Sequence, residues 1–162
     1  MFALLALKKE GWDLCYLEDR ISFPEAESLE KLLTSYQERG TPILLSLDPP
    51  AQECLLITKA NHHMGRITRT LFDRAPRLGL TEENLKKQDY EIISITQVKP
   101  RVQFEDLGAL VFYINLFKED FPEFNLTTYQ EKLLSLQEEI DTLGYWESSE
   151  HYKLYHIKKA AE

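Results

Sequence analysis

The sequence alternates between strand-like and helix-like segments, and this alternation constrains the fold more than any other feature. Residues 90–98 include Ile92, Ile93 and Ile95, and this density of β-branched residues predicts a strand. Residues 81–87 begin with a threonine followed by two glutamates, which is typical of a helix N-terminus. Strands that alternate with helices predict an α/β layered domain with a central mixed sheet flanked by helices.

Apolar residues at helical spacing predict three further helices. Side-chain oxygens and proline are common at a helix start, and glycine is common just after its end. The middle helix of the three is apolar on most sides, so we expect it to be buried. The helices are expected from Pro24 to Gly40 with Ser22 as a possible cap, over residues 106–117, and from Thr127 or Thr128 to Gly144.

Short aliphatic runs predict the remaining strands. Asp48-Pro49-Pro50 cannot continue a hydrogen-bonded ladder, so we expect a turn there. The first run could equally be the end of a helix, and residues 61–72 are expected to form a helical or irregular connection. The runs lie at residues 2–7, 12–17, 42–47, 54–58 and 151–157.

Length and composition indicate one soluble globular domain over residues 1–162. The chain has 43% hydrophobic and 28% charged residues, which is ordinary for a folded protein. Its formal net charge of −8 argues against broad nucleic-acid binding. The apolar N-terminal run stops at Lys8, so we expect neither a membrane span nor a signal peptide. Cys15 and Cys54 are expected to be buried free thiols, which favours a cytoplasmic location.

The histidines and cysteines predict no metal site. His62 and His63 are adjacent, so their side chains point apart in a helix or a strand. No carboxylate or cysteine is spaced to complete a site with them. A structural or solvent-exposed role is therefore our interpretation of both histidines.

The segment 104–113 resembles a motif of a known family. It reads Phe-Glu-Asp-Leu-Gly-Ala-Leu-Val-Phe-Tyr, and a Pro-aromatic segment at 121–124, an amphipathic helix and a closing strand around His151 follow it. This order is similar to the C-terminal portion of class I S-adenosylmethionine-dependent methyltransferases of the type 11-like group. The resemblance covers residues 61–162 and leaves 1–60 as a divergent N-terminal part.

The resemblance implies which strands of the methyltransferase fold the chain contains. Residues 12–17 resemble the fourth strand, residues 43–58 cover the fifth, and residues 89–93 resemble the sixth. Residues 148–159 contain the last strand. The resemblance thus implies part of a Rossmann-like sheet and, as the activity, methyl transfer from S-adenosylmethionine to a small acceptor.

The resemblance also implies two groups of site residues. In this family the turn after the fourth strand lines the cofactor and acceptor pocket, and the 104–113 run and the last strand add residues near the acceptor. No catalytic residue is identified. The implied residues are Leu17, Glu18, Asp19 and Arg20 for S-adenosylmethionine, and Asp106, Gly108, Tyr113 and His151 for the acceptor.

The chain lacks the glycine-rich turn that holds the cofactor in such enzymes. Its six glycines lie at residues 11, 40, 65, 79, 108 and 144, and no two are close enough to form Gly-x-Gly. Three explanations stay open: the N-terminal half of an ancestral enzyme is absent, another chain supplies it, or the domain no longer binds the cofactor. The alternative function is a non-enzymatic interaction module or homodimer, which would use the acidic surface or an exposed sheet edge.

Overall fold

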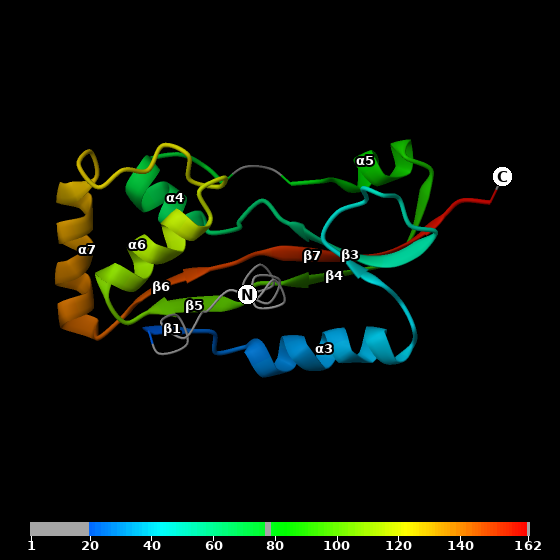
Figure 1. Ribbon diagram of the computed structural model, residues 1–162, viewed down its shortest axis with the longest axis horizontal. Coiled ribbons are helices and arrows are strands. Elements are labelled where there is room, and N and C mark those ends of the chain that lie inside the picture. The colour runs from blue at the N-terminus through cyan, green and yellow to red at the C-terminus, as the bar shows by residue number, and fades with distance from the viewer. Residues whose placement is uncertain (1–19, 77–78, 162) are drawn as a thin grey trace. The chain divides into compact units, whose positions relative to one another are not determined.

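The structure is a computed structural model that describes residues 20–76 and 79–161 (Figure 1). The chain forms two compact units, and the strands predicted at 2–7 and 12–17 lie outside the described residues. A single domain over the whole chain stays a prediction. Of the described residues, unit 1 comprises 20–24, 64–76 and 100–149, and unit 2 comprises 25–63, 79–99 and 150–161.

Unit 2 contains a four-stranded mixed sheet in the order β2-β3-β7-β4. β2 is parallel to β3, and β7 lies antiparallel between β3 and β4. The two late strands predicted from the sequence, now β4 and β7, are therefore neighbours in one sheet. The elements of unit 2 are α3 (Ala26–Glu38), β2 (Ile43–Leu44), β3 (Glu53–Lys59), α5 (Glu82–Lys87), β4 (Tyr90–Val98) and β7 (Tyr152–Lys159).

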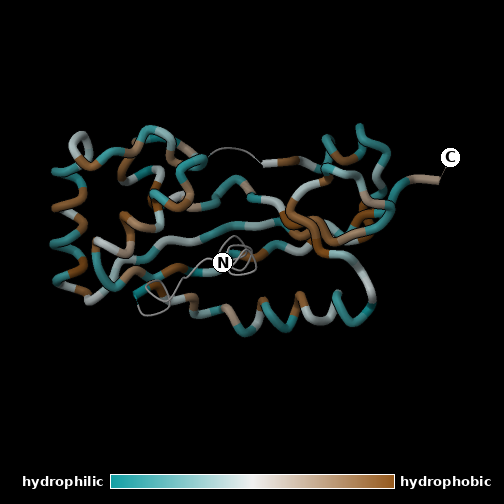
Figure 2. Tube along the Cα trace, in the orientation of Figure 1, coloured by the Kyte–Doolittle hydropathy of each residue, from teal (hydrophilic) through white to brown (hydrophobic). Residues whose placement is uncertain are grey.

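Helices cover both faces of this sheet (Figure 1). α5 places Leu85 in a buried apolar cluster with Leu56 and Tyr155. α3 places Tyr36 against His156, with ring centroids 5.7 Å apart. Because successive residues of β7 point to opposite faces, Tyr155 and His156 mark the two covered faces. Figure 2 shows hydrophobic residues concentrated where β3 and β7 run together.

Unit 1 contains a three-stranded antiparallel sheet in the order β1-β5-β6. The sheet and three helices share one apolar core. In that core the Phe104 ring lies 5.3 Å from the Tyr113 ring and 6.3 Å from the Trp146 ring. The elements of unit 1 are β1 (Ile21–Ser22), α4 (Gly65–Phe72), β5 (Arg101–Phe104), α6 (Leu107–Leu116), α7 (Gln130–Leu143) and β6 (Trp146–Ser149).

Three predicted helix ends are confirmed. The Asp106 carboxylate caps α6 and accepts a hydrogen bond of 2.7 Å from the Ala109 N–H. Thr81 and Asn84 form a reciprocal capping box at the start of α5. α7 ends at Gly144, whose φ of 85° is the left-handed conformation that favours glycine.

Two predicted helix caps are wrong. Ser22 belongs to β1, and α3 begins after Glu25 without a side-chain cap hydrogen bond. α7 begins after Tyr129 and not at Thr127 or Thr128, and the turn before it is held by Asn125, whose Oδ1 accepts a hydrogen bond of 2.8 Å from the Thr128 N–H.

The single central sheet predicted from the sequence is replaced by two sheets, one in each unit. β5 and β6 were not predicted because each has only four residues, too few for a clear alternating pattern. The described chain is thus α/β, with one mixed and one antiparallel sheet flanked by helices. None of the described helices is long and apolar enough to cross a membrane.

Candidate functional site

The residues implied by the methyltransferase resemblance fall in both units, so each unit is described by itself. Unit 1 holds Arg20, Asp106, Gly108 and Tyr113, and unit 2 holds His151. The other implied cofactor residues, Leu17, Glu18 and Asp19, lie outside the described residues.

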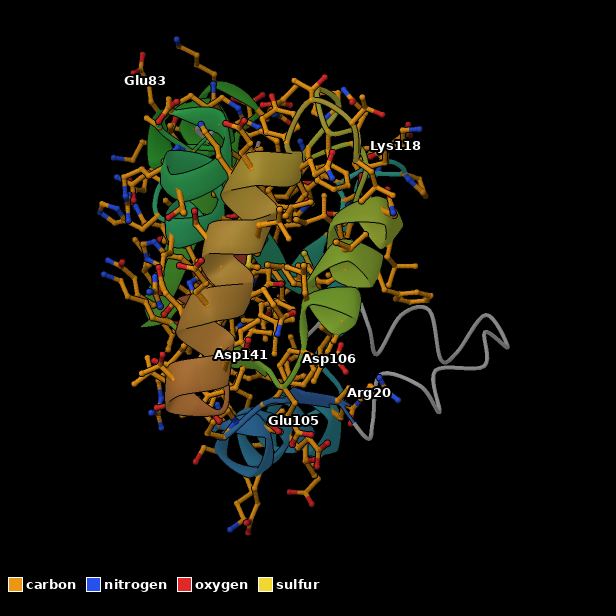
Figure 3. All side chains as sticks on the ribbon, turned by 90° about the vertical axis from the view of Figure 1, so that its left-hand side faces the viewer. Arg20, Glu83, Glu105, Asp106, Lys118 and Asp141 are labelled. Atoms are coloured by element: carbon orange, nitrogen blue, oxygen red, sulfur yellow. The ribbon has the colours of Figure 1, made fainter. Side chains whose placement is uncertain are left out.

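Arg20 and Asp106 form an ion pair at the start of α6 (Figure 3). Arg20 Nη1 lies 2.6 Å from Asp106 Oδ2, while Asp106 Oδ1 accepts the cap hydrogen bond from the Ala109 N–H. The Glu105 N–H also donates to the Arg20 carbonyl oxygen at 2.9 Å. Both carboxylate oxygens of Asp106 thus hold local structure, and a ligand would have to displace these partners.

Gly108 and Tyr113 lie on α6 in different surroundings. Gly108 is exposed in the first turn. The Tyr113 side chain is 2% exposed and its ring lies 5.3 Å from the Phe104 ring and 4.6 Å from the Phe117 ring. Its hydroxyl lies 3.5 Å from the Met64 sulfur. Tyr113 therefore belongs to the core of unit 1.

His151 lies at the carboxyl end of β3, where the Ala60 N–H donates to its carbonyl oxygen at 2.8 Å. The residue is 2% exposed. Its Nδ1 accepts a hydrogen bond of 3.2 Å from the His62 N–H, and its Nε2 lies 3.0 Å from Gln97 Oε1. We refer to His62, His63, Gln97 and His151 as the histidine cluster.

Hydrogen bonding sets the protonation of two rings in the histidine cluster. The His151 N–H donates to His63 Nδ1 at 3.1 Å, just as the His62 N–H donates to His151 Nδ1. Because a backbone N–H can only donate, Nδ1 carries no proton in either ring. Both imidazoles are therefore neutral with the proton on Nε2, and the His151 Nε2–H donates to Gln97 Oε1.

Ring contacts complete the histidine cluster. The His62 and His151 rings are stacked, with centroids 5.5 Å apart and planes 16° apart. The His63 ring meets the Tyr152 ring at a centroid distance of 5.0 Å. His62 is exposed whereas His151 is buried, so the cluster joins a solvent-facing imidazole to a buried one.

Three basic groups act on the pKa of His151 in addition to its burial. Burial lowers the pKa of His151 below its ordinary value of 6.5, and the charges of Lys99, His62 and Lys153 lower it further. Lys153 is paired with Glu82 Oε1 at 3.1 Å. Lys99 is exposed and has no ion-pair partner within residues 20–76 and 79–161, so its charge is available to a ligand.

A second polar cluster lies between α5 and β7. Glu82 Oε1 accepts hydrogen bonds from the Tyr155 hydroxyl at 3.3 Å and from Lys153 Nζ at 3.1 Å. Burial, together with the Glu82 charge, raises the pKa of Tyr155 to about 12. The hydrogen bond from Lys153 lowers the pKa of the Glu82 carboxyl. Tyr155 is fully buried, so this cluster is a structural link between helix and strand.

The resemblance implied His151 as an acceptor residue, which stays a prediction, and sequence reasoning did not connect it with its hydrogen-bond partners His62 and Gln97. The adjacent rings do point apart, with His62 towards His151 and His63 towards Tyr152. One feature of the sequence could have indicated His62: the histidine pair follows the strand predicted at residues 54–58 by a few residues. Ligands of α/β sheets bind beyond the carboxyl ends of strands, so residues in such positions are candidates for a site. Among the residues that the structure describes, no three His, Cys, Asp or Glu side chains are arranged to hold a metal ion.

No family model, no curated protein and no solved structure matches this chain.

Proposed function

We propose that the chain is a methyltransferase-related α/β domain that binds a small anionic methyl acceptor at the carboxyl end of β3, while another chain holds S-adenosylmethionine. One observation carries the proposal. The histidine cluster, with His151 at its centre, lies at the end of β3 within reach of the Lys99 charge.

The strand order of unit 2 supports the relationship to methyltransferases. The segment 43–58, which resembles the fifth strand of that family, contributes two strands, β2 and β3, and the segments that resemble the sixth and last strands contribute β4 and β7. Of these, β3, β7 and β4 are neighbours in one sheet. β3 is buried over residues 54–57, as expected for a strand covered on both faces in a layered α/β fold. The run 104–113 ends β5 at Phe104 and begins α6 after the Asp106 cap, which is the buried helix that apolar spacing predicted over residues 106–117.

The chemistry of the histidine cluster supports an anionic acceptor. The exposed His62 ring and the Gln97 amide can donate hydrogen bonds to oxygen atoms. Lys99 adds a positive charge, which attracts anions to this end of the sheet. A small carboxylate matches both features, because it offers two acceptor oxygens and one negative charge.

The described residues do not fit S-adenosylmethionine itself. Five of the six glycines are described: two follow helix ends, two lie within helices, and a Cβ on Gly79 would lie 1.8 Å from the Lys59 carbonyl oxygen. None of the five forms a turn that cradles a cofactor. Arg20, the one described residue of the implied cofactor group, is already engaged in an ion pair. We therefore assign no methyl-transfer step to this chain alone.

An NMR titration with three probes of similar size tests the proposed acceptor site. Benzoate, benzyl alcohol and benzylamine share one ring and differ in charge. We expect benzoate to shift the amide signals of His62, Gln97 and His151 most, and benzylamine to shift them least. Lys99→Met should weaken benzoate binding about two- to fivefold, since an exposed charge pair contributes modestly. Lys118→Met, which removes an exposed lysine of unit 1, should leave it unchanged.

Equal shifts for the three probes, or shifts that avoid the histidine cluster, would contradict the proposed acceptor site. Signals along β4 that change with protein concentration would instead favour the interaction module. β4 is an edge strand of the described sheet, and Ile93 and Ile95 are 50% and 43% exposed on it. Exposed apolar residues on an edge strand favour pairing with another chain.

A further inference from the structure

We propose that the histidine cluster is an acid-sensitive tie that joins residues 60–63 to residues 150–152 and opens when its imidazoles are protonated. The inference goes beyond the proposed function, because it concerns the stability of unit 2 and needs no ligand. It rests on the hydrogen bonds that cross between the two segments.

At least three hydrogen bonds cross between these segments, and two of them need an unprotonated imidazole. The Ala60 N–H donates to the His151 carbonyl oxygen at 2.8 Å, independently of pH. The His62 N–H donates to His151 Nδ1 at 3.2 Å, and the His151 N–H donates to His63 Nδ1 at 3.1 Å. The two histidines thus accept from each other's segment in a reciprocal arrangement.

Protonation turns each of these acceptors into a donor. An N–H at Nδ1 of His151 would face the His62 N–H, and an N–H at Nδ1 of His63 would face the His151 N–H. Two donors that face each other lose the hydrogen bond and repel. Because His151 is 2% exposed, water cannot compensate the charge unless the segments separate.

The charged groups around His151 favour its neutral form. Lys99 follows β4, Lys153 lies on β7 and His62 follows β3, and all three lower the pKa of His151. Among the acidic groups, Glu82 on α5 is engaged by Lys153. Glu150 is buried, directly precedes His151 in the chain and is not without an interaction partner.

The sign of the pH dependence follows from the lowered pKa. Between the ordinary pKa of 6.5 and the lower pKa of the folded chain, the unfolded or opened form binds more protons than the closed form. The stability that His151 contributes is therefore fully present above about pH 6.5 and is lost as the pH falls below it.

Amide hydrogen exchange of the full chain, followed by NMR from about pH 8 to about pH 5, tests the tie. After correction for intrinsic exchange, the protection factors of the His62 and His151 amides should be constant above about pH 6.5. Below it they should fall by up to about tenfold per pH unit for each linked proton. In His151→Asn, the side-chain oxygen can still accept a hydrogen bond from the His62 N–H, but the side chain does not titrate. The protection factors of this variant should therefore fall less steeply with pH than those of the unsubstituted chain, by up to about tenfold less per pH unit.

His156→Asn is the matched control. His156 also lies on β7, but its Nε2 is bonded to Glu53 Oε1 at 2.9 Å, and no backbone amide of the described part of the chain donates to its ring. The variant should therefore keep the full acid dependence at His62 and His151. Protection that does not change with pH, or an equal fall in His151→Asn and the unsubstituted chain, would overturn the proposal.

Ring NMR of the unsubstituted chain gives a test that does not depend on a variant that folds. The ¹⁵N shifts of His151 and His63 should show the neutral Nε2–H tautomer at about pH 8. A proton on Nδ1 in both rings, or titration of His151 at or above 6.5, would overturn the proposal. Neither amide exchange nor ring NMR involves a methyl acceptor. A negative result would therefore overturn the acid-sensitive tie without bearing on the proposed function.

Discussion

Replacing Trp146 with alanine is expected to lower the free energy of unfolding by about 3–5 kcal/mol, the usual cost of truncating a large buried aromatic side chain. Trp146 is 1% exposed in the core of unit 1. The Arg66 guanidinium carbon lies 4.5 Å from the centre of its ring, and the Phe104 ring lies 6.3 Å away. The substitution removes all of these contacts and leaves a cavity under β6.

Chemical denaturation followed by circular dichroism measures this effect, and two variants serve as controls. Trp146→Phe should cost less, because an aromatic ring remains and the indole Nε1 has no hydrogen-bond partner among the described residues. Tyr145→Ala, at a position that is 41% exposed next to Trp146, should change stability by about 0.5 kcal/mol or less. A loss below about 1 kcal/mol in Trp146→Ala would contradict the core described for unit 1.

Tyr155 is expected to make the protein sensitive to alkali. Its pKa is raised to about 12 in the folded chain, mainly by burial and then by Glu82, compared with about 10 for a free tyrosine. The folded state therefore holds the phenolic proton more tightly than the unfolded state. The corresponding stability is present below about pH 10, and about 3 kcal/mol of it is lost as the pH rises towards 12.

Unfolding measurements from about pH 9 to about pH 12 with Tyr155→Phe check this expectation. The variant lacks the ionisable hydroxyl, so its stability should decline much less over this range than that of the unsubstituted chain. Tyr145→Phe, which removes an exposed hydroxyl, should keep the full alkaline decline. The account of Tyr155 would be wrong if the two variants declined equally.

Helices were the most predictable part of the fold, because their signals are local. The threonine and asparagine of the capping box, the aspartate that caps α6 and the glycine after α7 all lie within a few residues of the helix ends they define. The two wrong caps, at α3 and α7, are starts where no side chain satisfies the first N–H groups. Those positions depend on packing, which a local pattern does not reveal.

The division of strands between two sheets was not predictable from local pattern. β5 is paired with β1 and β6, which lie about 80 and 45 residues away in the sequence. β4 and β5 are separated by only two residues, Lys99 and Pro100, yet they belong to different sheets. Pro100 cannot donate to a strand ladder, and it marks the end of the long predicted strand.

The candidate site was partly predictable. The methyltransferase resemblance indicated His151, but its hydrogen-bond partners His62 and Gln97 are 89 and 54 residues away in the sequence. Only the pairing of β7 with both β3 and β4 brings these three residues together. Asp106 and Tyr113 were indicated by the same resemblance, and the structure assigns one to a helix cap and the other to a core.

Titration calorimetry with S-adenosylmethionine and S-adenosylhomocysteine tests most directly the central claim of the proposed function, that this chain does not itself hold the methyl donor. For the chain alone we predict no saturable heat up to about 1 mM of either ligand, because no described residue forms a cradle for them. Saturable one-to-one binding at micromolar concentration would contradict that claim and would make this chain the cofactor-binding part.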